Sequence, residues 1–219
     1  MTAPIVTVRG EAQREVPPDL ATLSVTVHSA GDSADRVRSE LASASSRIGG
    51  LLEQHAAAIE KSSTGGLYIA PVFSRRTETK ITGYRGSFTT SIVVHDFDAL
   101  SPIVFALAPL ANSQVDGPWW SLRPDNAAYR EVRLSAIDDA RRRADDYAGA
   151  VGATVQDLVE ISDLETGFSG VREMAAYRMA ASGAVEDSAF EFEPAVQTVT
   201  GQVTVRFTIS TPDLTTERG

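Results

Sequence analysis

Residues 5–28 read IVTVRGEAQREVPPDLATLSVTVH, and this stretch decides the fold class. Prolines at positions 17 and 18 break it into two strands, because proline cannot donate to a strand ladder. Beyond the break, apolar residues at positions 21, 23, 25 and 27 alternate with Leu20, Thr22, Ser24 and Thr26. A period of two predicts a strand with one apolar face toward a core and one mostly polar face. The chain is therefore expected to build a sheet from its first residues, and this opening contains no catalytic motif.

Three helices are predicted from apolar residues at helical spacing. The first follows a turn and N-cap at Gly31-Asp32-Ser33, and Gly49-Gly50 is expected to bend or fray its second half. A short helix is expected over residues 98–110, with Asp98 as its N-cap. The longest is expected over residues 126–151 and ends at Gly152. Its apolar stripe comprises Val132, Ala136, Ile137, Ala140, Ala144, Tyr147 and Ala148.

Strands are predicted between these helices. Beyond the two opening strands, they cover residues 67–73 and 80–94, which form a hairpin, and residues 113–122, 155–161 and 199–209. The order strand, long helix, strand, strand thus occurs twice, over units of about 5–96 and 113–210. We therefore predict an α+β fold in which the long helices pack on antiparallel sheet, with both units forming a single domain over residues 1–219.

Residues 165–189 fit neither unit. The segment is rich in glycine and serine, yet it also contains Phe168, Met174, Tyr177 and Met179. A loop of this length without its own secondary structure is uncommon and is often functional or disordered. Two interpretations stay open: a flexible insertion, or a short helix around Met174–Met179 that docks on a partner subunit.

Charge and composition exclude several classes of protein. The net charge of −9 disfavours nucleic-acid and anionic lipid partners. The one dense basic run, Arg141-Arg142-Arg143, lies among aspartates and predicts ion pairs on a solvated helix face. The absence of cysteine excludes disulfides, thiolate catalysis and cysteine metal sites.

The cellular location is predicted from the first residues and from hydropathy. The chain begins without a basic segment and an apolar stretch like those of a signal peptide, so a cytoplasmic protein is expected. A periplasmic or secreted protein is the alternative if such a peptide was removed. No apolar run approaches the roughly 18 residues of a membrane-spanning helix, so a soluble protein without membrane insertion is expected.

Several motifs together resemble one family. Val6-Thr7-Val8-Arg9-Gly10-Glu11 followed by Val16-Pro17-Pro18-Asp19-Leu20-Ala21 is similar to the opening of SIMPL-domain (DUF541) proteins. Ile81-Thr82-Gly83-Tyr84-Arg85-Gly86-Ser87 resembles a strand of that family, and Val93–Asp98 follows it as in the family pattern. The helix at Ala136–Gly152 and the strand at Val199–Ile209 resemble the family's later elements.

This resemblance implies a fold and a set of biological contexts. The family includes bacterial periplasmic immunogenic proteins, has an α+β fold, and contains members that assemble into ring-like oligomers. Its members are linked to envelope or oxidative-stress phenotypes and to host immune recognition. It supplies no catalytic residues to transfer. This chain departs from the pattern at its N-terminus, at Gly10-Glu11-Ala12 and at Trp119-Trp120.

No constellation of catalytic, cofactor-binding or metal-ligating residues is found. His28, His55 and His95 have none of the spacings of a zinc motif, and no G-x-S-x-G or phosphate-binding loop occurs. We therefore expect no cofactor, no metal and no enzymatic activity. The candidate interface residues are Arg85, Trp119, Trp120, Met174 and Tyr177.

Strand geometry explains the choice of Arg85 and the tryptophans. Tyr84 and Arg85 point to opposite faces, so Tyr84 is expected to pack under a helix and Arg85 to face outward. Arg85 is then available to an anion or to a carboxylate of a neighbouring subunit. Trp119 and Trp120 likewise divide between core and surface.

Two functions from different classes remain open, with a hydrolase-like enzyme as an unsupported third. The first is a self-assembling or interaction protein that forms a homo-oligomer through exposed strand edges and the long helices. The second is a small-molecule or anion-binding protein with a cleft between the two units.

Overall fold

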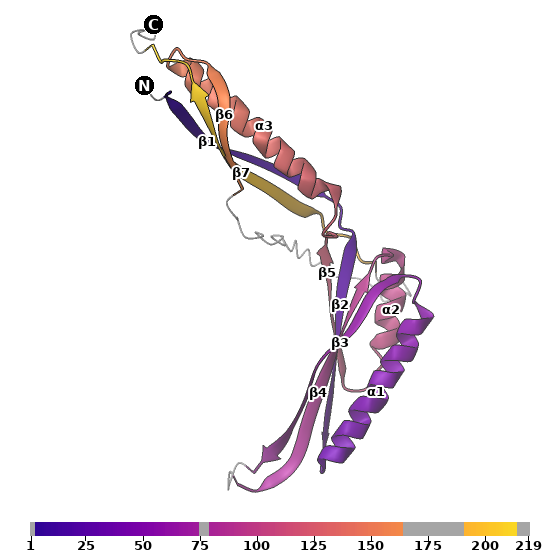
Figure 1. Ribbon diagram of the computed structural model, residues 1–219. Coiled ribbons are helices and arrows are strands. Elements are labelled where there is room, and N and C mark those ends of the chain that lie inside the picture. The colour runs from indigo at the N-terminus through magenta and orange to yellow at the C-terminus, as the bar shows by residue number, and fades with distance from the viewer. Residues whose placement is uncertain (1–2, 75–78, 164–190, 214–219) are drawn as a thin grey trace, which may run out of the picture. The chain divides into compact units, whose positions relative to one another are not determined.

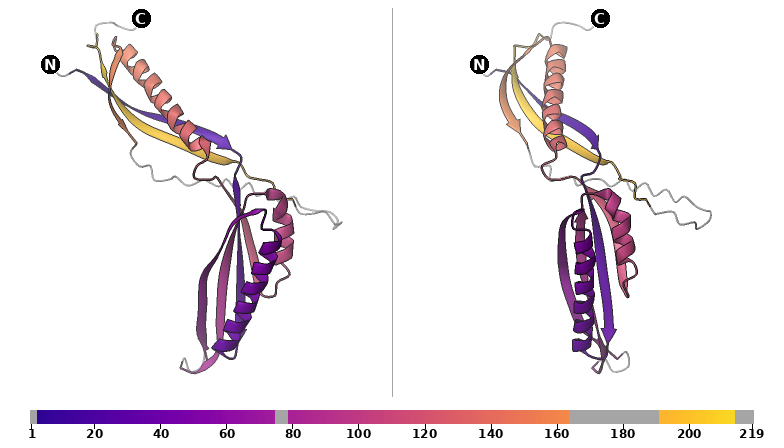
Figure 2. Two further views of the ribbon diagram at one scale, coloured as in Figure 1. Left: turned by 45° about the vertical axis from the view of Figure 1, so that its right-hand side comes forward. Right: turned by 90° about the vertical axis from the view of Figure 1, so that its right-hand side faces the viewer.

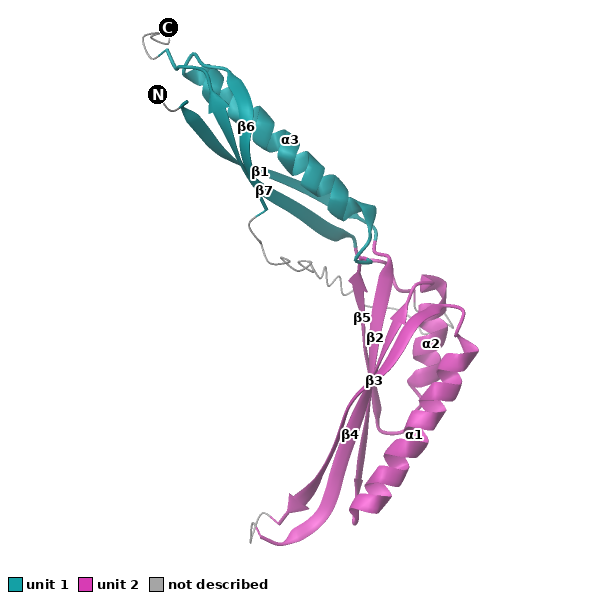
Figure 3. Cartoon of the chain, viewed as in Figure 1, with its two compact units in different colours: residues 1–17, 123–176, 196–219 teal, residues 18–122, 177–195 magenta. Residues whose placement is uncertain are grey.

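The computed structural model describes residues 3–74, 79–163 and 191–213, which form seven strands and three α-helices in an α+β fold (Figure 1). The strands make two antiparallel sheets, and the chain divides into two compact units (Figure 3). Unit 1 comprises residues 1–17, 123–176 and 196–219, and unit 2 comprises residues 18–122 and 177–195. The predicted α+β class is thus confirmed.

Unit 2 is built on a four-stranded sheet with the order β3-β4-β2-β5. Its strands are β2 (Leu20–Gly31), β3 (Ile59–Phe73), β4 (Ile81–Val94) and β5 (Ser113–Ser121). Every second residue of β2 is buried, from Ala21 to Ser29, as the alternation predicted. This face supports the larger core, which the helices of the unit cover.

Helix α1 (Ala34–Gln54) begins at Ser33, whose hydroxyl accepts a hydrogen bond from the Arg36 N–H at 3.3 Å. Its buried stripe is Val37, Leu41, Ile48 and Leu52. The helix continues through Gly49-Gly50 without a break, contrary to the expected bend or fraying. Both glycines lie on the outer side, where an added methyl group would meet nothing within 4 Å. The packing of Ile48 and Leu52 on either side holds the helix together.

The short helix of unit 2 starts differently from the prediction. Asp96, not Asp98, is the capping residue, because its carboxylate accepts the Asp98 N–H at 3.2 Å. A 3-10 turn (Phe97–Ala99) follows and leads into α2 (Leu100–Leu107). Pro102 lies in the first turn of α2, where its missing N–H has no helical partner to lose.

Unit 1 combines a three-stranded sheet with one long helix. The sheet has the order β1-β7-β6, with β1 (Ile5–Val16), β6 (Val155–Ser162) and β7 (Gln197–Ile209). Helix α3 (Ala127–Ala150) runs along one face of this sheet (Figure 2). Its buried residues are Ala128, Val132, Ala136, Ala140, Ala144 and Ala148. Tyr147 was predicted to join this stripe, but its side chain is 59% exposed because the stripe follows a strict spacing of four.

Glycines in the sheet let α3 approach it closely. A methyl group added at Gly10 would collide with the Ala136 carbonyl oxygen, and one at Gly201 would lie 2.6 Å from the Val132 carbonyl oxygen. Alanine on the helix and glycine on the strands therefore bring two backbones together. Gly152 follows α3 with a φ of 69°, so it ends the helix in the left-handed conformation, as predicted.

The composition of the two units differs from the expected division. β5 pairs with β2, and β1 pairs with β7, so β5 belongs to the first repeat and β1 to the second. The break at Pro17-Pro18 directs consecutive strands into different sheets, which element order alone does not reveal. β3 also begins at Ile59, eight positions before the predicted start at Leu67. The predicted insertion at 165–189 lies outside the described residues.

Candidate functional site

The face of the unit 2 sheet opposite the helices is lined with hydroxyl groups. The strand register pairs Ser24 with Ser91 and Thr26 with Thr89 across β2 and β4. The hydroxyl groups of Thr26 and Thr89 hydrogen-bond at 3.0 Å. Both helices of the unit pack against the other face, so this hydroxyl-rich face is not part of the larger core.

A depression of about 730 Å³ lies at one end of this face. Its lining residues come from β2, β3, β4 and the start of β5: His28, Ser29, Ala30, Tyr68, Arg85, Gly86, Ser87, Asn112, Ser113 and Gln114. The strand register explains its shape. Arg85 lies between Ala30 and Ala70 on the neighbouring strands, and Ser87 lies between His28 and Tyr68. Small side chains such as Ala30 and Ser87 therefore form the floor. The rings of His28 and Tyr68 and the guanidinium group of Arg85 surround it.

A smaller depression of about 330 Å³ adjoins the first and shares His28, Ser29 and Asn112 with it. Glu40 of α1 contributes to its wall. The Ser29 hydroxyl donates to Glu40 at 2.7 Å, and the Arg36 Nε donates to the same carboxylate at 3.0 Å. These hydrogen bonds, with the one from Ser29 the largest influence, lower the pKa of Glu40. The carboxylate is therefore already satisfied from within the protein.

The β3–β4 hairpin carries exposed apolar side chains. It extends past the end of β2, whose last paired residue is Gly31 opposite Tyr84. The exposed large residues of the hairpin are Leu67, Tyr68, Val72, Phe73 and Ile81. Phe73 and Ile81 pair across the two strands and are 49% and 45% exposed. A cluster of this kind on one element is typical of an interaction surface.

The two adjacent tryptophans lie in different environments. Trp120 packs against the larger core and meets Phe97 edge-on, with ring centroids 4.9 Å apart. Trp119 is 43% exposed on β5, an edge strand of the sheet. Trp119 is therefore the indole available at the surface.

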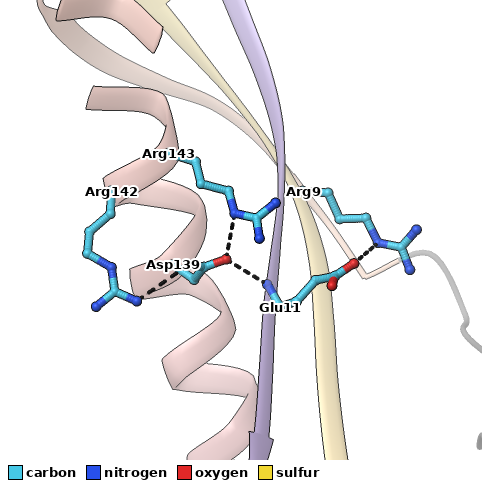
Figure 4. A network of polar contacts seen from close by, with 5 residues as sticks. All are labelled: Arg9, Glu11, Asp139, Arg142 and Arg143. Carbon is cyan, nitrogen blue, oxygen red and sulfur yellow. Dashed lines mark hydrogen bonds and ion pairs between the residues drawn. The ribbon is translucent and has the colours of Figure 1, made fainter. Parts of the chain in front are cut away.

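A polar network in unit 1 joins α3 to β1 (Figure 4). Asp139 accepts the backbone N–H of Glu11 at 3.0 Å and pairs with Arg143 at 2.9 Å and Arg142 at 3.4 Å. The N–H of Glu11 is the largest of the influences that lower the pKa of Asp139, ahead of the two arginines. Within the 141–143 basic run, the predicted ion pairs are thus present at Arg142 and Arg143, and they have a structural role.

The family comparison agrees with the architecture of both units. A family model described as SIMPL, a protein of unknown function (DUF541), matches residues 6–207. This chain belongs to the SIMPL family. The matched range begins in β1 and ends in β7, so it includes both sheets and all three helices. A search of curated proteins found no match to the chain.

The described part of this SIMPL chain contains no group of three metal-ligating side chains. Among the same residues, no helix is both long and apolar enough to cross a membrane. The candidate surfaces of unit 2 are the hydroxyl-rich face with its depression and the exposed hairpin.

The structure separates the interface residues that the sequence singled out. Arg85 lies opposite Ala30 of β2, whereas Trp119 lies opposite Thr22, eight residues away and roughly 26 Å along the strand. These two side chains do not form one site. Met174 and Tyr177 lie outside the described residues.

Sequence reasoning missed the residues that surround Arg85. His28 is on the polar face predicted for β2, and Tyr68 lies in a predicted strand. Their meeting on either side of Ser87 depends on the pairing register of three strands, which the alternation of side chains does not specify.

Proposed function

We propose that this SIMPL-family protein is a non-enzymatic interaction module that associates with a second copy of itself through its β3–β4 hairpin. The observation that supports this proposal most strongly is the exposed apolar end of the hairpin, where Phe73 and Ile81 lie side by side. Water contact with such a cluster is unfavourable, and burial against another surface removes it.

The outer edge of β3 supports the same proposal. β3 is an edge strand of its sheet, and from Ser62 to Phe73 it contains no charged side chain. Natural edge strands are often protected by lysine, by inward-pointing charges or by a covering helix. β3 has Lys61 at one end and Pro71 near the other, with a long uncharged stretch between them. Between the register shift at Thr64–Leu67 and Pro71, the unpaired backbone groups of β3 can therefore accept another strand.

A second copy is a suitable partner for this edge. Two β3 strands can pair antiparallel about a twofold axis, so that each supplies the same surface to the other. The pairing would also bring the apolar hairpin residues of both copies near the interface. The long helices and residues 165–189 are the further contacts proposed for a larger assembly.

A second candidate function, binding of a small anionic molecule, is favoured by the depression beside Arg85. This depression belongs to unit 2 alone and is lined by polar groups and a cation.

The proposal is tested by comparing two phenylalanine variants by light scattering over a range of protein concentrations. Phe73→Ser removes an exposed apolar side chain from the hairpin, and Phe105→Ser removes one of similar exposure, 54%, from α2. The native protein is expected to form a multimer. Phe73→Ser is expected to raise the dissociation constant by about 30-fold, as for an interface hot spot, while Phe105→Ser leaves it unchanged.

A monomeric native protein at all concentrations would contradict the proposal. Equal weakening by both variants would also contradict it, because the association would then reflect general surface hydrophobicity and not the hairpin.

A further inference from the structure

We propose that the depression beside Arg85 binds a carboxylated sugar, with the Arg85 guanidinium group holding the carboxylate. This site goes beyond self-association, because it lies on the hydroxyl-rich face of the unit 2 sheet and not on the outer edge of β3. Three features of the depression support this assignment: the charge of Arg85, an open backbone donor, and two rings across a small floor.

Arg85 is a cation without an internal partner. Its side chain is exposed and makes no ion pair or hydrogen bond with any other residue that the structure describes. None of the residues that line the depression is acidic. In a chain of net charge −9, an arginine in a hollow without carboxylates is a local site of opposite sign. A guanidinium group matches the two oxygens of a carboxylate in geometry as well as in charge.

Two acidic residues on elements that line the two depressions do not compete for Arg85. Glu40, in the adjoining depression, is occupied by the Ser29 hydroxyl and by Arg36. Asp116 lies on β5 opposite Ser24. Ser24 is six positions from Ala30 along β2, a distance of roughly 20 Å. Its carboxylate accepts a hydrogen bond from the Gln114 amide at 2.9 Å. The charge of Arg85 is therefore left for a ligand.

The end of β5 leaves a backbone donor open beside Arg85. The pairing of β2 with β5 ends at Val27 opposite Ser113, and the His28 N–H then donates to the Asn112 carbonyl at 2.9 Å. Because backbone groups alternate between the two sides of a strand, the Ala30 N–H points to the same side as that of His28. No described strand continues there, so this donor is free for a ligand oxygen.

Two rings and several polar groups complete the site. His28 and Tyr68 lie on the strands on either side of Ser87, so their α-carbons are roughly 10 Å apart across a small hydroxyl side chain. Tyr68 is 50% exposed and offers a ring face to the carbon–hydrogen surface of a sugar. Ser87, Asn112 and Gln114 also line the hollow, and hydroxyl and amide side chains of these types suit sugar hydroxyl groups.

The test is a titration of the isotope-labelled full chain, followed by amide NMR shifts, with sodium glucuronate as the probe. Glucose, which lacks the carboxylate, and sodium acetate, which lacks the ring and hydroxyls, are the comparison probes. The variants are Arg85→Gln and Tyr68→Ala. The matched control is Lys61→Gln, which removes the same charge from β3 at a position opposite Val93, eight residues from Arg85 along β4.

Glucuronate is expected to shift the amides of His28, Ala30 and Ser87 with saturation in the millimolar range, as suits an open site. Arg85→Gln is expected to weaken this binding at least about tenfold, as the loss of a charge-assisted pair predicts. Tyr68→Ala is expected to weaken it less, and Lys61→Gln to leave it unchanged. Glucose and acetate are expected to bind far more weakly than glucuronate.

Three results would overturn the proposal. The first is the absence of saturable shifts with glucuronate, and the second is equal binding by the native chain and Arg85→Gln. Equal binding of acetate and glucuronate would reduce the site to a general anion contact and would sink the assignment to a sugar.

Discussion

The backbone N–H of Glu11 donates to the carboxylate of Asp139 at 3.0 Å, on the side of β1 that faces away from β7. β1 is an edge strand, so this N–H has no neighbouring strand to receive it. Helix α3 thus covers part of an edge that other strands could otherwise extend. Arg142 and Arg143 hold the same carboxylate from the helix side (Figure 4).

Asp139→Asn is expected to lower the melting temperature at neutral pH. The hydrogen bond from Glu11 and the two arginines lower the pKa of Asp139 in the folded protein below its ordinary value of 3.8. A lowered folded pKa means that the ionised carboxylate stabilises the native state above the unfolded pKa. This stabilisation is lost as the pH falls through the folded pKa. The difference in melting temperature between the native protein and the variant should therefore be largest at pH 7 and should disappear below about pH 4.

Thermal unfolding at several pH values measures this difference. Asp138→Asn is the matched control, since Asp138 is exposed on the same helix. The difference in melting temperature between the native protein and Asp139→Asn could instead stay constant down to acidic pH. That result would show that the charge of Asp139 is not its cause.

Gly10→Ala is expected to destabilise unit 1 by about 3 kcal/mol, at the upper end of the cost of overpacking. The added methyl group would meet the Ala136 carbonyl and the Ala140 backbone, neither of which can move without shifting α3. Gly49→Ala is the opposite case, because the new side chain faces open space on a helix. It should raise stability by about 0.5–1 kcal/mol. Urea unfolding measures the free energy of unfolding of both variants. An unchanged value for Gly10→Ala would refute the close contact between β1 and α3.

Substitution of the two tryptophans should separate core packing from surface association. Trp120→Ala is expected to cost about 3 kcal/mol, because the indole packs on Phe97 and on the larger core. Trp119→Ala should change stability by no more than about 0.5 kcal/mol, as for a surface position. It should leave the pairing of two copies through β3 unchanged, because β5 is the opposite edge of the sheet, and should lower the solution mass only of a larger assembly. Urea unfolding and light scattering give the two values. An unchanged mass of this larger assembly for Trp119→Ala would remove the residue from its contacts.

The sequence predicted those elements whose apolar spacing is regular. The alternation in β2 and the four-residue spacing in α3 both appear as buried faces, and Ser33 and Gly152 begin and end helices as expected. Local chemistry controls these features, so local sequence reveals them.

Prediction failed where the answer depended on distant parts of the chain. The start of β3 was missed because residues 59–66 lack an apolar alternation, and their strand conformation comes from pairing with β4. The sequence also placed β5 in the second repeat, whereas its pairing with β2 places it in the first. Arg85 was recognised as an outward-facing cation, but the alanines beside it and the rings near it are set by register.

A fragment of residues 18–122 is expected to fold on its own. It contains the whole sheet β3-β4-β2-β5 and both helices that cover it. All the buried residues of the larger core lie within this range, and of the partly buried ones only Phe192 is outside it. A chain of this length can bury enough surface to be stable. The fragment should therefore unfold cooperatively on heating, as circular dichroism would show.

A shorter fragment of residues 18–112 is the control for this prediction. It lacks β5, and with it Trp120 and Val115, which pack against the core, so its melting temperature should be lower. A fragment 18–122 without a cooperative transition would mean that unit 2 depends on the rest of the chain. Such a result would give Phe192 a larger share of the stability than its partly buried position against the core indicates.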